Sequence, residues 1–126
     1  MHKILVVDDE PAIIKILKTF LSRKGFDVVD ALGGEKALEV LDSNIDFDML
    51  IIDMKMPRVK GIDVLRRMKD LNKQQPVIIL SGSIDIMKHG NELESLGYGH
   101  SEYLIKPIDL EVLLGKIKQA LGINPE

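Results

Sequence analysis

The sequence contains no cysteine and no large excess of either charge sign. The absence of cysteine excludes disulfides, thiolate metal sites and cysteine nucleophiles, and it is compatible with a reducing cytoplasm. The 17 Lys and Arg residues stand against 20 Asp and Glu residues, for a net charge of -3. We therefore expect no broad positive field, no acidic tail and no direct binding to nucleic acid.

Long hydrophobic runs are absent as well. The first ten residues, MHKILVVDDE, contain a short apolar run that acidic residues stop at once. This segment is neither a signal peptide nor a membrane span, so we expect a cytoplasmic protein that does not enter a membrane. A chain of 126 residues falls in the commonest size range for one domain. We expect that domain to cover residues 1–122, with a short tail at 123–126.

Short apolar or β-branched segments alternate with segments that carry apolar residues at helical spacing. The first kind predicts strands covered on both faces, at Ile4–Val7, Asp27–Ala31, Met49–Ile52, Val77–Leu80 and Tyr103–Ile105. The second kind predicts helices at Pro11–Lys24, Glu35–Asp42, Ile62–Leu71, Ile84–Leu96 and Leu110–Leu121. Strict alternation predicts an α/β fold with a parallel sheet, right-handed crossovers and helices on both faces.

The first predicted helix has the clearest apolar stripe and the clearest end signals. Asp9 or Glu10 can cap its start, Pro11 suits its first turn, and Gly25 suits its end. Asp109 is expected to cap the last helix. The stripe consists of Ile13, Ile16, Leu17, Phe20 and Leu21.

Polar residues stand at the ends of four of the predicted strands. Ligands of open parallel sheets bind beyond the carboxyl ends of the strands, so we expect one shared pocket. Carboxylate oxygens suit magnesium, which keeps waters or phosphate oxygens in its other positions. Such a pocket also offers a carboxylate nucleophile, a hydroxyl and an ammonium for an incoming phosphoryl group. The residues are Asp8 with Asp9, Asp53, Ser81 with Gly82, and Lys106 with Pro107.

The motifs DDE, DxxMPxxxG from Asp53 to Gly61, SG and KP occur in this order. Together they closely resemble the receiver domain of two-component response regulators, over nearly the whole chain. The resemblance implies a flavodoxin-like fold of five strands in the order 2-1-3-4-5 with five helices. It also implies phosphoryl transfer to Asp53 from a histidine kinase, a phosphotransfer protein or a small phosphodonor.

The resemblance further implies how the site is built. Magnesium would be held by Asp9, Asp53 and the Lys55 backbone carbonyl, with Asp8 assisting through water. Contacts to the phosphoryl oxygens would come from Ser81 and Lys106, the Lys106 to Pro107 bond would be cis, and Tyr103 would act in a switch.

Phosphorylation adds roughly two negative charges. The family responds with a population shift of the face around the fourth helix, fifth strand and fifth helix. We therefore expect a signalling domain that binds an unidentified downstream protein and catalyses nothing beyond its own phosphoryl transfer and dephosphorylation. The resemblance leaves open a homodimer that forms on phosphorylation.

Two features depart from the family pattern. Lys55 stands where the family often has Asn, a smaller polar or an apolar residue. We hypothesise that it competes with magnesium in the empty pocket and shields the phosphoryl group from water. The segment from Ser81 to Lys106 is a few residues longer than expected and contains three further glycines, which favours a short, bent or mobile fourth helix.

Simpler explanations remain open for single residues. The acidic pair can be helix caps, Asp53 a loop-start residue, and Ser81 a turn residue. Tyr103 can be an ordinary packed aromatic. For the whole chain, the alternative is a phosphorylation-independent pseudo-receiver that only binds partners. Three histidines lack metal-ligand spacing and are expected to be solvent-exposed: His2, His89 and His100.

Overall fold

A computed structural model describes residues 2–99 and 102–123 of the chain. Its strands are β1 (Lys3–Asp8), β2 (Asp27–Leu32), β3 (Met49–Asp53), β4 (Val77–Ser81) and β5 (Tyr103–Ile105). Its helices are α1 (Pro11–Arg23), α2 (Gly34–Asp42), α3 (Gly61–Asp70), α4 (Ser83–Ser95) and α5 (Leu110–Leu121). Every predicted element is present, and each boundary agrees with the prediction to within one residue.

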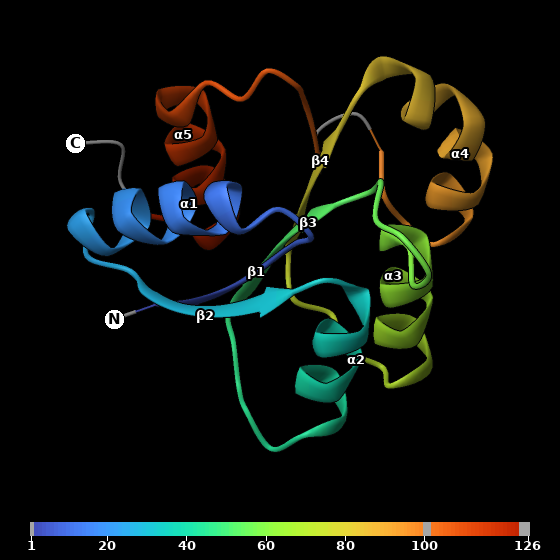
Figure 1. Ribbon diagram of the computed structural model, residues 1–126, viewed down its shortest axis with the longest axis horizontal. Coiled ribbons are helices and arrows are strands. Elements are labelled where there is room, and N and C mark those ends of the chain that lie inside the picture. The colour runs from blue at the N-terminus through green and yellow to red at the C-terminus, as the bar shows by residue number, and fades with distance from the viewer. Residues whose placement is uncertain (1, 100–101, 124–126) are drawn as a thin grey trace.

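The strands form one parallel sheet in the order β2-β1-β3-β4-β5 (Figure 1). This order confirms the predicted fold class. The chain moves outward from β1 to β2 and then returns past β1 to β3, so the direction of strand order reverses between β1 and β3. Such a reversal opens a crevice at the carboxyl ends of these two strands.

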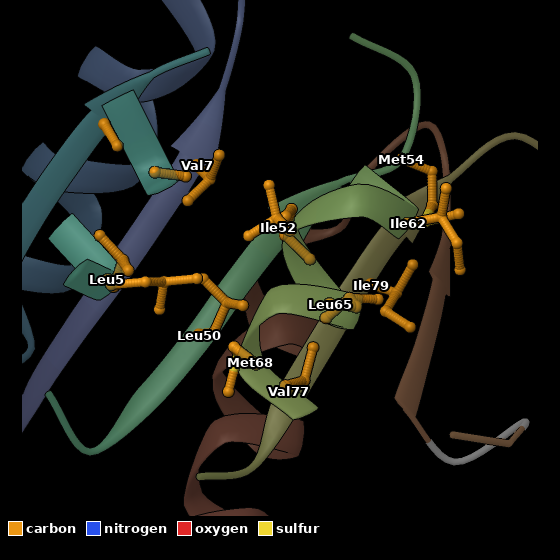
Figure 2. Close-up of a cluster of buried hydrophobic side chains, with 14 of the residues drawn as sticks. Leu5, Val7, Leu50, Ile52, Met54, Ile62, Leu65, Met68, Val77 and Ile79 are labelled. Carbon is orange, nitrogen blue, oxygen red and sulfur yellow. The ribbon is translucent and has the colours of Figure 1, made fainter. Parts of the chain in front are cut away.

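Helices cover both faces of the sheet. Successive side chains of a strand point to opposite faces, so Leu5 and Val7 join one core while Ile4 and Val6 join the other. The first core lies under α2, α3 and α4, and the second lies under α1 and α5 (Figure 1). Figure 2 shows part of the first core, where strand residues meet the α3 side chains Ile62, Leu65 and Met68.

The strands run one residue further than the apolar pattern predicts. Backbone pairing continues through the polar residue that ends β1, β3 and β4, with the partners Asp8 and Leu32, Asp53 and Leu80, and Ser81 and Ile105. These polar side chains are therefore held by the sheet and do not belong to loops. A side chain at the end of a hydrogen-bonded strand has a fixed position, which favours a precise site.

Two apolar residues of α1 and β2 are exposed, and one of them departs from the sequence prediction. Ile16 is 50% exposed, although it was expected in the buried stripe of α1. The buried face is centred on Ile14, Leu17 and Leu21, and at 100° per residue Ile16 falls past its edge. Leu32 of β2 is 52% exposed because β2 is an edge strand that is only partly covered.

The helix ends follow the predictions in part. The Asp109 carboxylate accepts hydrogen bonds from the backbone N–H groups of Glu111 and Val112, so it caps α5 as expected. Glu10 occupies the capping position of α1, but its side chain makes no capping bond. The helix α4 is a continuous helix of 13 residues, so of the expected alternatives of a short, bent or mobile helix the first was wrong, and the other two stay predictions. Within the described residues, no helix has the length and apolarity to cross a bilayer.

Candidate functional site

A cavity of about 780 Å³ opens at the carboxyl ends of β1, β3 and β5. The side next to α1 is acidic, and the side next to α3 and α4 carries several cations. Apolar residues also line the cavity. The lining residues are Asp9, Glu10, Asp53, Met54, Lys55, Met56, Pro57, Lys60, Lys88, His89 and Lys106.

Asp53 and Lys106 form the floor of this cavity. Asp53 is 2% exposed, and its Oδ1 lies 3.0 Å from the Lys106 Nζ. The Lys106 backbone N–H donates to the Ser81 carbonyl at 2.9 Å, which continues the pairing of β5 with β4. The lysine is therefore fixed beside the carboxylate by the sheet itself. The peptide bond between Lys106 and Pro107 is cis.

For both Asp53 and Lys106, burial and the attraction between the two opposite charges shift the pKa in opposite directions. Burial raises the pKa of Asp53, and the hydrogen bond and charge of Lys106 offset only part of that rise. Burial lowers the pKa of Lys106, but the bond to Asp53 and the nearby carboxylates raise it by more. The lysine is consequently charged at neutral pH, and it is the cation that makes an ionised Asp53 tolerable.

Asp8 is a fully buried carboxylate at the end of β1. Its Oδ1 accepts the Glu10 backbone N–H at 3.0 Å, whereas its Oδ2 has no hydrogen-bond partner. Burial, together with the charges of Asp53 and Asp9, raises the pKa of Asp8 to about 6. A buried carboxylate oxygen without a donor is unfavourable, and a cation at this position would satisfy it.

The acidic side of the cavity fits a hard divalent cation. Asp8, Asp9 and Glu10 each offer one carboxylate oxygen, and these oxygens lie within 4.8 Å of one another. Oxygen donors of this kind suit magnesium. The Lys55 backbone also reaches the site, because its N–H lies 3.4 Å from Asp53 Oδ1. Glu10 is the member of this cluster that the predicted ligand set left out.

Ser81 and Tyr103 do not line the cavity. Ser81 is buried, and its hydroxyl donates to the Gly82 carbonyl at 2.9 Å. Tyr103 is half-buried in β5 and packs against the core under α2, α3 and α4. Burial and the Glu102 carboxylate raise the pKa of the Tyr103 phenol. The roles that the resemblance implies for these two residues stay predictions.

The loop after β3 returns closely to the strand, which explains the glycine of the DxxMPxxxG motif. The Gly61 backbone N–H donates to the Met54 carbonyl at 3.1 Å. A Cβ atom on Gly61 would lie 2.6 Å from the Asp53 carbonyl oxygen and 2.8 Å from the Met54 Cα. Only glycine permits this approach, so the residue that starts α3 also fixes the backbone of Asp53.

Among the charged and polar residues of the cavity, sequence reasoning missed three besides Glu10. Lys60 precedes α3, and both Lys88 and His89 lie in α4. No local pattern identifies them, because their place at the cavity depends on how α3 and α4 pack on the sheet. The histidine prediction also needs correction: His2 and His89 are half-buried, whereas His100 lies outside the described residues.

The sequence and the fold both match known receiver proteins. Residues 4–118 match the family model of the response regulator receiver domain. The transcriptional regulatory protein CpxR of Escherichia coli K12 is 38% identical over 96% of this chain. The chemotaxis protein CheY1 of Helicobacter pylori J99 is 35% identical over 97% of it. The chain spans 50% of the length of CpxR and 98% of the length of CheY1.

Solved structures give the same assignment. A response regulator receiver domain protein of Clostridium thermocellum is 34% identical, with a TM-score of 0.85 over 97% of this chain and 95% of that one. The response regulator TrrA of Thermotoga maritima, solved in complex with Mg²⁺ and BeF, is 31% identical. Its TM-score is 0.80 over 96% of this chain and 100% of that one. The chain therefore belongs to the response regulator receiver domains, the signalling domains of two-component systems.

Proposed function

We propose that this domain is a phosphorylation-activated switch whose phosphoacceptor is Asp53. The phosphoryl group comes from a histidine kinase or a phosphotransfer protein, and the modified domain binds a downstream protein. The observation that carries this proposal is the contact between Lys106 and a buried Asp53 inside a cavity that also holds an acidic cluster.

The geometry supports an in-line displacement. The Asp53 side-chain contacts from the Lys106 ammonium and the Lys55 N–H both go to Oδ1, so we assign Oδ2 as the nucleophile. It forms a bond to phosphorus while the bond from phosphorus to the donor's histidine nitrogen breaks. The electron pair of that bond returns to the imidazole. Lys106 neutralises the phosphoryl oxygens as their charge rises.

We further propose that Asp9, Asp53 and the Lys55 carbonyl hold magnesium, with Asp8 placed to orient the bound ion through water. The unpartnered Oδ2 of Asp8 and the neighbouring oxygens of Asp9 and Glu10 support this assignment. Magnesium, when bound, neutralises charge on the phosphoryl oxygens and on the carboxylates. The residues of the chain provide its position, and Lys106 provides the second cation.

The coupling to partners would run through Ser81 and β5. In the described state, the Ser81 hydroxyl is directed to Gly82. We propose that it turns to the phosphoryl group after modification, and that Tyr103 changes its packing at the same time. The face formed by α4, β5 and α5 exposes apolar side chains that suit a protein partner. Among them are Met87 at 83%, Ile105 at 47% and Val112 at 47% exposure.

Intact mass spectrometry tests this proposal. The chain is incubated with magnesium and a histidine phosphotransfer donor, beside the same mixture with a chelator and beside an Asp53→Asn variant. We expect one added phosphoryl group in the parent with magnesium and none in the variant. An unmodified parent would favour the pseudo-receiver alternative, in which the domain binds its partner without phosphorylation.

A further inference from the structure

We propose that Lys88 and His89 of α4 form the leaving-group side of the phosphorylation site. In this role they favour acyl phosphates over donors that carry phosphorus on nitrogen. The inference rests on the proposed function, because it assigns a donor preference to the same site. It starts from the observation that both residues line the cavity that contains Asp53 and Lys106.

The packing of α4 against α3 directs these residues toward the cavity. In Figure 1 the orange end of α4 lies next to α3, and the Arg66 Nε donates to the Glu92 Oε2 at 2.6 Å. Lys88 precedes Glu92 by four residues and therefore shares its helix face. In the same way, His89 precedes Leu93, which is fully buried in the core. The face of α4 that contacts α3 thus continues to the mouth of the cavity.

The cations at this mouth are not paired with carboxylates of the protein in the described residues. Lys106 is paired with Asp53, but among the described residues neither Lys88 nor Lys60 has an ion pair. The acidic residues of the site lie on the opposite side, next to α1. The α3 and α4 side therefore presents cations to whatever occupies the cavity. An anionic group that enters from solvent is attracted to this side.

The reaction places a leaving group near these cations. Asp53 attacks phosphorus from the floor of the cavity, so an in-line leaving group departs toward the mouth. When the donor is an acyl phosphate, the bond between phosphorus and oxygen breaks. The electron pair stays on that oxygen, and a carboxylate anion is released. A cation at the mouth stabilises this developing charge more than it stabilises the bound donor, which accelerates transfer.

A donor with a phosphorus to nitrogen bond behaves differently. In phosphoramidate the nitrogen carries its proton when the bond breaks, and it leaves as neutral ammonia. No negative charge develops on the leaving group, so Lys88 has little to stabilise beyond the phosphoryl oxygens themselves. The difference between the two donors therefore isolates an effect on the leaving group from general attraction of anions.

The test compares the two donors in one set of variants. Phosphorylation of the full chain is followed with acetyl phosphate and with phosphoramidate, both with magnesium, in the parent, Lys88→Gln, Lys88→Arg and His89→Gln. Lys69→Gln is the matched control, because Lys69 is an exposed lysine in the last turn of α3 and does not line the cavity. The readout is the second-order rate constant of phosphorylation with each donor.

We expect Lys88→Gln to lower the second-order rate constant with acetyl phosphate by about threefold to tenfold, the size of effect expected when one partly screened charge is removed. With phosphoramidate the loss should stay under about twofold, because no charge develops on the leaving group. His89→Gln should show the same donor dependence to a smaller extent, and Lys88→Arg and Lys69→Gln should resemble the parent.

Equal losses with both donors, or no loss with either, would overturn the inference while the parent still becomes phosphorylated. A parent that reacts with neither small donor, nor with the histidine phosphotransfer donor, would instead refute the proposed function. The two failures are therefore distinguishable.

Discussion

Asp8 is a residue whose ionised form lowers the stability of the fold, although the proposed metal site needs that form. It is fully buried, one of its oxygens has no partner, and its pKa is raised to about 6 from 3.8. A raised carboxylate pKa means that the folded state holds its proton to higher pH than the unfolded state does. The ionised form therefore reduces stability, and this cost develops as the pH rises from 3.8 to 6.

We predict that Asp8→Asn stabilises the magnesium-free protein at pH 8. The gain in unfolding free energy should be about 1 to 3 kcal/mol, the size of the ionisation cost that the amide removes. At pH 4 the gain should be much smaller, because Asp8 is then protonated in the folded state and close to its own pKa of 3.8 in the unfolded state. Urea unfolding in a chelator at pH 4 and pH 8 measures it, with the exposed Asp46→Asn as control. A destabilised variant at pH 8 would contradict this interpretation.

Lys55 is the residue-scale departure from the family pattern. Its side chain is exposed, it lines the cavity, and its backbone N–H lies 3.4 Å from Asp53 Oδ1. An ammonium beside the acidic side opposes magnesium by charge repulsion. We hypothesise that it also protects the phosphoryl group from water once the group is in place.

Replacement of Lys55 by Asn tests both parts of this hypothesis. We predict an increase in magnesium affinity of about threefold to tenfold, because a screened unit charge is removed near the ion. We also predict a shorter phosphoryl lifetime. Magnesium titration and the decay of the phosphorylated mass measure the two quantities, with Lys69→Asn as the exposed control. Unchanged affinity together with an unchanged lifetime would reject the hypothesis.

At the scale of elements, the pattern of apolar residues predicted the strands and helices well. The strands are short apolar runs, and the helices carry apolar residues at helical spacing. The predicted strands ended one residue before Asp8, Asp53 and Ser81. A polar residue ends an apolar run, but backbone pairing continues through these three residues. The motifs nevertheless predicted correctly that Asp9, Asp53 and Lys106 line one cavity. Lys88 and His89 could not be predicted, because helix packing and not local sequence places them there.

Two glycines in helices should respond oppositely to the same substitution. A Cβ on Gly61 would meet the Asp53 carbonyl oxygen at 2.6 Å, whereas a Cβ on Gly115 of α5 meets nothing within 4 Å. We predict that Gly61→Ala destabilises by about 1 to 3 kcal/mol, because backbone must shift to relieve the clash. Gly115→Ala should stabilise by about 0.5 to 1 kcal/mol through helix propensity. Thermal unfolding measures both changes.

The rate of phosphorylation should also differ between Gly61→Ala and Gly115→Ala. Gly61→Ala displaces the backbone of Asp53 and should slow phosphorylation, whereas Gly115→Ala lies in α5 and does not line the cavity. If Gly61→Ala were as stable and as reactive as the parent, the close approach of the loop after β3 would not be needed for the site.

At the scale of the whole molecule, the sheet links Asp53, the proposed phosphoacceptor, to the surface around β5. Lys106 contacts Asp53 through its side chain and Ser81 through its backbone, so a change at Asp53 pulls on β4 and β5 together. In the described part of the chain, β1 and β2 make no hydrogen bond or ion pair with Lys106, although the charge of Asp8 in β1 affects its pKa. A change at the site should therefore reach α4, β5 and α5 before it reaches α2.

Hydrogen exchange with magnesium and beryllofluoride, a phosphoryl mimic, tests this route. We predict altered exchange over β5 and α5, which include the Ile105 and Val112 surface, and little change over α2. In an Asp53→Asn variant, exchange over β5 and α5 should stay unaltered as well. Changes confined to the loops around Asp9 and Lys55 would show that the site binds the mimic without transmitting a signal to the α4, β5 and α5 face.

The identity of the modified residue is the central claim, and chemical mapping measures it most directly. After phosphorylation with magnesium, borohydride reduces an aspartyl phosphate to homoserine, and peptide mass spectrometry locates the converted residue. The account predicts homoserine at position 53 alone, and none when magnesium is chelated. Conversion at another acidic residue such as Asp9, or phosphorylated protein in which Asp53 stays intact, would contradict it.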